Sequence, residues 1–355
     1  VTFYYLFNVN RQSYNQTMKQ TDKEKTDSRA AMQNKDFRQA INFAFDRHAY
    51  AAQTNGEDGA DRILRNTVTP SNFVQIGGKN FGDAVNEKMV NYGTEWSNIN
   101  LNDAQAAFLD PEKAKAEFAK AKESLQAEGV TFPIHLDMLV DQTAKLDVQQ
   151  ASSFKQTVEA TLGSDNVVID IIQLSPDEKD NATFFADTAD QKDYDIDISG
   201  WSGDFSDPKT YLDLLDPDSG SQLKNLGLTP GKDNDIKEKL GLATYKELLD
   251  AADKENENTQ TRYEKFAEVQ AWLTDSALFL PVQSGGANPI FRKTVPFTAA
   301  FSFVGHKGDA DNYKYVEMQK EPVTAKQYQE LYEKWQKEKA ESNKKAQEDL
   351  ANHVQ

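Results

Sequence analysis

The 355-residue chain contains no cysteine. This absence excludes disulfide bonds, thiol catalysis and cysteine-ligated metal sites, but it assigns no compartment, because secreted proteins can lack cysteine too. Only four histidines are present, and no two of them have metal-ligand spacing. No apolar run reaches the roughly 20 residues of a transmembrane helix. The sequence begins at Val1 without a signal peptide, so we expect it to be a fragment of a longer protein.

Positive charge is scarce in this chain. Forty Lys and Arg residues stand against 57 Asp and Glu residues, which gives a formal net charge of −17. Nucleic acids and anionic membrane surfaces would repel such a protein. Hydrophobic residues make up 38% and charged residues 27%, as in globular proteins with polar surfaces. We therefore expect no nucleic-acid partner and a chain long enough for two or three domains.

Two motifs of enzymes and nucleotide-binding proteins are nearly present, but each lacks a required residue. Gly200-Trp201-Ser202-Gly203-Asp204 has an aspartate where the nucleophile elbow of a hydrolase needs glycine. The stretch from Gly227 to Asp233 has an aspartate where a phosphate-binding loop needs serine or threonine. We expect a protein without enzymatic activity and without a cofactor. Two acids paired for glycoside hydrolysis stay open, because sequence spacing does not give the distance between carboxylates.

A calcium loop is also nearly present. Asp193, Asp195 and Asp197 match its first ligands, but Ile198 occupies the position of its glycine and Asp204 that of its bidentate glutamate. We expect no metal here, although a weak calcium site stays open.

Alternating strand-like and helix-like patterns predict an α/β fold with a sheet covered by helices. The strand at 167–172 is too apolar for an edge facing water. Polar composition predicts an exposed loop or short helix at 11–28, and loops at 48–109 and 217–240. The predicted strands are 2–10, 65–69, 133–140, 167–172, 194–199, 279–286 and 313–316, and the predicted helices lie near 36–47, 110–129, 151–162, 177–189 and 259–277 and in the tail from 324.

One loop follows a strand in a position typical of ligand sites. Alternation over 194–199 predicts a strand with one buried face, and Gly200 ends it. Asp207-Pro208 predicts an N-cap followed by proline at the first helical position. Trp201 and Asp204 therefore lie between a strand end and a helix start, where ligands bind in open α/β sheets.

Trp201-Ser202-Gly203-Asp204, followed by residues 205–208, resembles the tryptophan–x–x–aspartate segment of one family. This family is the peptide-binding subfamily of extracellular solute-binding proteins, the receptors of oligopeptide ABC importers. Arg38–Arg47, Asp110–Ala114 and Ala277–Gln283 resemble further segments of the family, in its order. In its many predicted loops and its acidic composition, the sequence is most similar to the Ami/Ali-type oligopeptide-binding lipoproteins of streptococci.

The resemblance implies a periplasmic-binding-protein-like lobe of type II, with a central mixed sheet covered by helices. Residues 1–295 would be the second lobe of a two-lobed receptor, 296–320 a return segment of the first lobe, and 321–355 a helical tail. The apolar stripe of this tail ends at Trp335. We expect the first half of the tail to dock and the rest to be solvated.

The resemblance also implies a function. The protein would be the substrate-binding component of an oligopeptide ABC importer, a monomer that captures short extracellular peptides between its lobes and delivers them to the permease. It would lie at the cell surface on a lipid anchor absent from this fragment. In the family, the aspartate matched by Asp204 meets the α-ammonium of the peptide. Trp201 would give an apolar wall, and Ser202, Gly203 and Phe205 would complete the ligand-binding loop.

Alternatives remain at this point. The chain could be a lobe of a surface adhesin that binds a host protein or glycan, or a hydrolase of peptides or sugars. Asp204 could simply cap local backbone amides. Material that co-purifies after incubation with a peptide mixture would separate intact peptides, a partner and products.

Overall fold

The computed structural model describes residues 1–285, 291–298 and 316–353. They form two compact units: Val1–Ser202 with Asp207–Gly286, and Gly203–Ser206 with Ala287–Gln355. Most of the predicted return segment, and most of the strand predicted at 313–316, lie outside the described residues.

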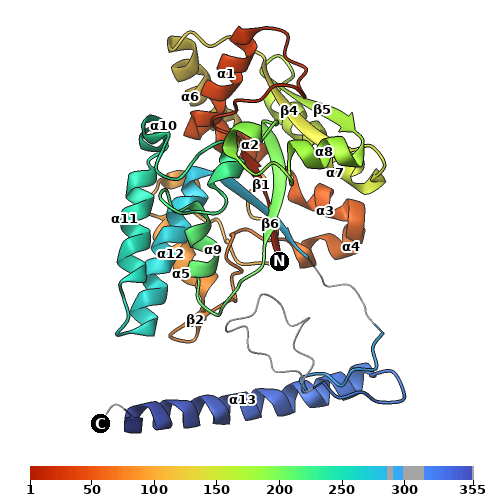
Figure 1. Ribbon diagram of the computed structural model, residues 1–355, viewed down its shortest axis with the longest axis vertical. Helices are drawn as coiled ribbons and strands as arrows, with labels where there is room; N and C mark the ends of the chain where they lie inside the picture. The colour runs from red at the N-terminus through yellow and green to blue at the C-terminus, as the bar shows by residue number, and fades with distance from the viewer. Residues whose placement is uncertain (286–290, 299–315, 354–355) are drawn as a thin grey trace. The chain divides into compact units, whose positions relative to one another are not determined.

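The first unit is built on a five-stranded mixed sheet of order β5-β4-β6-β1-β7. Strand β4 runs parallel to β5 and β6, and β1 runs antiparallel to β6 and β7. Figure 1 shows β1, β6 and the strand after α12 side by side, although they come from distant parts of the chain. This arrangement confirms the predicted mixed α/β sheet. The strands are β1 (Thr2–Phe7), β4 (Ile134–Asp141), β5 (Val167–Leu174), β6 (Ile196–Trp201) and β7 (Phe279–Ser284), with a separate hairpin of β2 (Gln75–Ile76) and β3 (Lys79–Asn80).

Helices pack on this sheet and on each other. Helix α7 packs against β4 and β5, α1 and α8 against β4, and α12 against β7, while α2 packs on α6. In the first unit the helices are α1 (Asp22–Gln33), α2 (Lys35–Ala44), α3 (Arg47–Asn55), α4 (Glu57–Ala60), α5 (Phe81–Met89), α6 (Pro111–Ala127), α7 (Lys145–Leu162), α8 (Pro176–Ala182), α9 (Lys209–Leu212), α10 (Asn234–Lys239), α11 (Leu242–Asp253) and α12 (Thr259–Ser276).

Local signals located several helices well. Asp110 accepts a hydrogen bond from the Lys113 amide at 3.1 Å and begins α6, with Pro111 at its first position. Helix α7 ends at Gly163, whose φ of +87° favours glycine. A few neighbouring residues decide where a helix begins and ends, so these positions can be predicted from the sequence.

The apolar strand β5 lies at the edge of the sheet, contrary to the sequence prediction. At Ile169, two side chains of α7 bind the backbone groups of this edge. The Ile169 amide donates to Glu159 at 2.8 Å, and Lys155 donates to the Ile169 carbonyl at 2.7 Å. Val167 and Ile169 are buried, since α7 packs against the strand. The apolar composition of β5 therefore indicated that a helix covers one of its faces. Such a strand does not need a neighbouring strand on both sides.

Strand β6 differs from its prediction in two ways. It continues through Gly200 to Trp201, which pairs with Thr2. Gly200 serves a close approach, because a Cβ there would lie 2.8 Å from the Phe3 ring. Asp195, which the alternation over 194–199 places within the strand on the face opposite the buried one, lies one residue before β6 and is 1% exposed.

Other polar stretches are also more ordered than predicted. Residues 11–28 include the start of α1 and two buried cations, Arg11 and Lys19. Residues 48–109 contain most of α3, then α4, the β2–β3 hairpin and α5. The strand predicted at 65–69 is absent there, and only a single bridge pairs the preceding Leu64 with Gln283. The loop predicted at 217–240 contains α10. Tertiary contacts outweigh weak local periodicity in these stretches.

The segment Arg38–Arg47, which carries the family resemblance, holds α2 onto the end of α12. Arg38 donates to the Ser276 carbonyl through Nε and Nη2, at 3.0 and 2.9 Å, and Gln39 donates to the Asp275 carbonyl at 2.5 Å. These carbonyls end a helix and lack partners within it. Arg47 donates to the Pro281 carbonyl of β7 at 2.6 Å. The segment therefore has a structural role.

The second unit contains helix α13 (Ala325–His353). The Phe297 ring contacts the rings of Tyr328, Tyr332 and Trp335, with centroids 5.3, 5.7 and 5.2 Å away. Residues 336–353 are all exposed. Among the described residues, no helix has both the length and the apolarity to cross a bilayer.

Candidate functional site

A cavity of about 250 Å³ opens in the first unit, and its lining comes from seven helices and strands. Strands β1 and β6 contribute Phe3, Tyr5, Asp197 and Ile198. Strand β4 contributes Met138, Leu139 and Val140, and β7 contributes Gln283. Helices α3, α7 and α8 contribute Tyr50, Asp147, Gln150, Ala151 and Lys179.

The cavity lies where two neighbouring parallel strands separate. Strands β4 and β6 are joined through the single pair Met138 and Ile196. The lining residues on β4 begin with Met138 of this pair, those on β6 follow Ile196, and both sets run toward the carboxyl ends of the strands. In open α/β sheets such a crevice is the usual ligand site.

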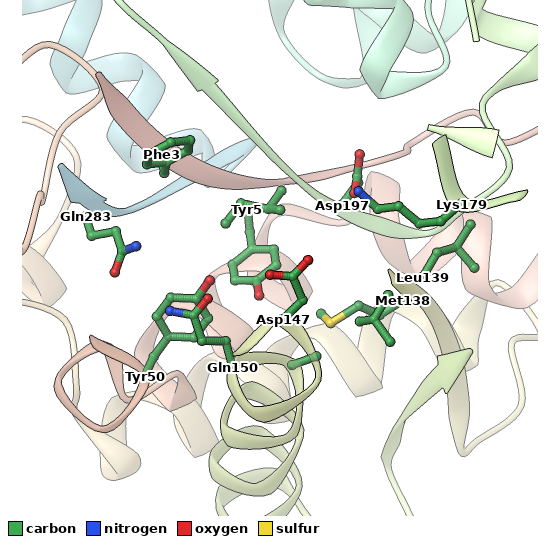
Figure 2. Close-up of a pocket in the computed structure, with 13 residues that line it drawn as sticks. Phe3, Tyr5, Tyr50, Met138, Leu139, Asp147, Gln150, Lys179, Asp197 and Gln283 are labelled. Atoms are coloured by element: carbon green, nitrogen blue, oxygen red, sulfur yellow. The ribbon is translucent and has the colours of Figure 1, made fainter. Parts of the chain in front are cut away.

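Figure 2 shows how the polar groups are distributed around the cavity. Tyr5, Tyr50, Gln150 and Asp147 gather in one part of it, while Asp197 and Lys179 lie together in another. Tyr5 and Tyr50 are almost fully buried, and their rings meet edge to face with centroids 5.9 Å apart. The site thus combines rigid aromatic walls with two carboxylates and one ammonium group.

Burial disfavours the charged forms of both carboxylates. It raises the pKa of Asp197 to about 6, although Lys179 and Lys192 act in the opposite direction. Partial burial likewise raises the pKa of Asp147, against the attraction of Lys179. The pKa of Tyr5 lies well above its ordinary value, mainly through burial, and both carboxylates add to this effect. Both acids therefore act electrostatically on Tyr5, although they lie in different parts of the cavity.

The sequence prediction placed the site on the loop after β6. Trp201 is the last residue of β6, partly buried against the core, and Ser202 follows it in the first unit. Neither is among the described residues that line the cavity. Gly203, Asp204 and Phe205 belong to the second unit. The ligand-binding role of these five residues stays a prediction.

The far end of this loop is fixed by Asp207. Its carboxylate accepts hydrogen bonds from Arg262 Nε at 2.7 Å and from the Lys209 amide at 3.0 Å. Helix α9 begins at Lys209, one residue later than predicted, with Pro208 as its N-cap residue. The aspartate–proline pair thus precedes a helix, but the predicted positions are wrong by one residue: Pro208, not Asp207, is the N-cap residue.

Two of the three aspartates that resemble a calcium loop bind cationic side chains. Arg11 contacts Asp193 at 2.8 Å and Asp195 at 3.0 Å, and Lys19 also bonds Asp195. Their carboxylate oxygens are therefore already compensated by protein charges. Within 1–285, 291–298 and 316–353, no group of three or more His, Cys, Asp or Glu side chains is arranged so that it could hold a metal ion.

Sequence reasoning missed most of the cavity. Tyr5 and Ile198 belong to strands whose apolar alternation indicates only core packing, and Tyr50, Asp147 and Lys179 belong to helices with no recognisable motif. The partial signal was Asp197, an acid within a strand that leads to the Trp201 loop.

The comparisons with known proteins agree with this architecture. The family model described as bacterial extracellular solute-binding proteins, family 5 Middle, matches residues 1–222. Oligopeptide-binding protein AliB of Streptococcus pneumoniae is 54% identical over 353 residues, which cover 99% of this chain and 54% of AliB. Oligopeptide-binding protein SarA of Streptococcus gordonii is 52% identical, over 98% of this chain and 52% of SarA. The chain thus spans about half the length of these relatives.

Solved structures show a similar fold. The substrate-binding domain of an oligopeptide ABC transporter from Bacillus anthracis matches 90% of this chain and 49% of its own, with a TM-score of 0.57 and 17% identity. Listeria monocytogenes OppA bound to peptide also matches 90% of this chain and 49% of its own, with a TM-score of 0.53 and 18% identity. These matches bear out the type II peptide-binding-protein fold expected from the sequence.

Proposed function

Because the chain belongs to the bacterial extracellular solute-binding proteins of family 5, we propose that it is part of the substrate-binding component of an oligopeptide ABC importer. The complete receptor captures short extracellular peptides in a cleft between two lobes and passes them to the permease. The names of AliB and SarA, both oligopeptide-binding proteins, support this substrate class.

The observation that carries the proposal is the crevice between β4 and β6. It is preformed, lies at the carboxyl ends of parallel strands and presents apolar walls with a few polar groups. Peptides of many sequences share a backbone and two termini. A receptor can therefore bind backbone groups through strand-like hydrogen bonds and leave the side chains in roomy, hydrated pockets.

The proposal includes the organisation of the receptor. Residues 1–295 form its second lobe, 296–320 return toward the first lobe, and 321–355 form a helical tail. A lipid anchor outside this chain holds the receptor, a monomer, at the outer cell surface. Its partners are peptides and the permease, and the chain catalyses no reaction.

Asp204 binds the free α-ammonium of the peptide in this proposal, and Trp201 borders the first side chain. An ammonium group that enters a closed cleft loses its hydration and needs an opposite charge with hydrogen-bond acceptors. A carboxylate on a short loop, held by β6 at one end and by Asp207 at the other, supplies them with little flexibility.

The test uses calorimetry on the complete receptor and one peptide in free and N-acetylated forms. Asp204→Asn should cost about 2–5 kcal/mol of affinity for the free peptide, the usual loss when one partner of a buried charge pair is removed. The acetylated peptide should be affected little. Equal wild-type affinity for both forms would contradict the role of Asp204, and a captured host protein, glycan or cleaved product in place of intact peptides would contradict the function itself.

A further inference from the structure

The cavity between β4 and β6 has both apolar walls and negatively charged groups, and few ligand groups suit both. Met138, Leu139 and Ile198 give it apolar walls, and Tyr5 and Tyr50 give it aromatic ones. Asp147 and Asp197 add negative charge, with the Asp147 carboxylate directed into the space beside the Tyr5 ring (Figure 2). A group that fits must be apolar along its length and positively charged at its end.

The charges of the lining residues do not balance. Asp147 and Asp197 contribute two negative charges and Lys179 contributes one positive charge. In the part of the chain that the structure describes, neither carboxylate has a Lys, Arg or His nitrogen within 4 Å, and the ion pair of Lys179 is with Asp180, at 3.9 Å. Lys179 and Lys192 attract Asp197, and Lys179 attracts Asp147, only from beyond this distance. The lining therefore keeps one excess negative charge with no cation of the described residues in direct contact, which is unfavourable in a partly desolvated site until a cation enters.

We propose that this cavity receives a basic side chain of the bound peptide, with Asp147 and Asp197 as its counter-charges. This inference rests on the proposed function and specifies the substrate class of the same site. Lysine and arginine carry an aliphatic stem that packs on apolar walls and a charged end group. That end group is also attracted by the faces of tyrosine rings. The cavity volume of about 250 Å³ is many times the ~10–15 Å³ that one water needs on the same measure, so it has room for such a side chain with some water.

The test offers the complete receptor a pool of short peptides in matched pairs. Each lysine peptide is paired with its acetyl-lysine form and each arginine peptide with its citrulline form, so the members differ in charge far more than in shape. Mass spectrometry of the retained peptides gives the ratio of charged to neutral members. Every pair is offered with a free and with an acetylated N-terminus, which separates a side-chain cation from the α-ammonium.

The wild type should retain the charged members about ten-fold more than their neutral partners, the effect of one favourable charge contact. Asp147→Asn and Asp197→Asn should each remove most of this preference while total peptide retention persists. Asp177→Asn is the matched control: it also removes an acid from the first turn of a helix, but it is exposed and outside the cavity lining. Melting curves of all variants confirm that they fold.

Each other outcome has a defined meaning. Retained peptides without a preference for charge, or with a preference for acidic residues, would overturn the inference and leave the proposed function intact. If Asp147→Asn and Asp197→Asn change only the preference for a free over an acetylated N-terminus, the cavity binds the α-ammonium and the side-chain assignment is wrong. If no peptide is retained at all, the proposed function fails and this inference fails with it.

Discussion

Arg11 and Asp137 stand 126 positions apart in the chain, and Arg11 Nη1 donates to Asp137 Oδ2 at 2.7 Å with both side chains fully buried. Lys19 Nζ reaches the same carboxylate oxygen at 2.8 Å, and the Met18 amide donates to the other oxygen at 3.0 Å. The polar segment that contains Arg11 and Lys19 is thereby fixed to β4. We call Arg11, Lys19, Asp137, Asp193 and Asp195 the buried ionic cluster.

Removing one member of the buried ionic cluster should destabilise the protein strongly. Arg11→Met leaves Asp137 and Asp193 without their guanidinium partner, which should lower the free energy of unfolding by about 3–5 kcal/mol. Urea titration measures the loss. Lys79→Met is the control, since its ion pair with Glu87 lies in solvent and should matter little. Equal effects of the two changes would show that the cluster does not hold the segment in place.

The cluster should also make the protein sensitive to acid. Burial alone would raise the pKa of Asp137, but the positive charges of Lys19 and Arg11 outweigh it and hold this pKa below the ordinary value of 3.8. A lowered folded-state pKa stabilises the protein above pH ~4, and the contribution is lost as pH falls through the folded pKa. We expect Asp137→Asn to remove part of the acid-induced loss of stability seen in urea titrations from pH 6 to pH 3. An unchanged pH profile would contradict this assignment.

Asp197 should affect stability with the opposite sign. Burial raises its pKa from 3.8 to about 6 despite Lys179 and Lys192, and Asp180 acts with burial. The folded state therefore binds its proton more tightly than the unfolded state, so this group costs stability as pH rises from ~4 to 6. Asp197→Asn should stabilise the ligand-free protein at pH 7 by about 1–3 kcal/mol. Urea titrations at pH 4.5 and 7 test this, because the gain should shrink at the lower pH.

Arg38 should not tolerate replacement by lysine. Its planar fork reaches the Ser276 carbonyl twice and the Met32 carbonyl at 2.7 Å, and a lysine supplies one point charge in place of this geometry. Arg38→Lys should cost about 2–4 kcal/mol, since buried carbonyls lose their donors. Lys115→Arg, on the exposed surface of α6, serves as the control for the exchange itself. A loss below 0.5 kcal/mol by urea titration would show that α12 does not depend on Arg38.

The tail should divide at Trp335. Its ring stacks on Phe297 with an interplanar angle of 21°, whereas residues 340–353 are exposed throughout. Trp335→Ala should therefore lower the melting temperature of the second unit, and truncation after Lys339 should leave it nearly unchanged. Calorimetric scans of both variants measure this. Similar losses would place the boundary of the packed part further along the helix.

Several elements could be predicted from sequence because neighbouring residues decide them. Helices α6 and α12, and α7 from residue 151 onward, follow from apolar spacing and from caps such as Asp110 and Gly163. The Trp201-to-Asp204 segment pointed to the peptide-binding family, and the comparisons bear this out. Such signals depend on residues a few positions apart or on a short fixed spacing, so they can be recognised in the sequence.

The sequence alone determined the α/β class, the bounds of α6 and α12 to within two residues, the start of α13, and the family. Only the tertiary structure decided that Arg11 and Lys19 are buried, that β5 lies at an edge, and that Asp147 and Asp197 line one cavity with Tyr5. The reason is physical. Periodicity records whether a face is covered but not which element covers it, and charges separated by more than a hundred positions compensate one another only after the chain has folded.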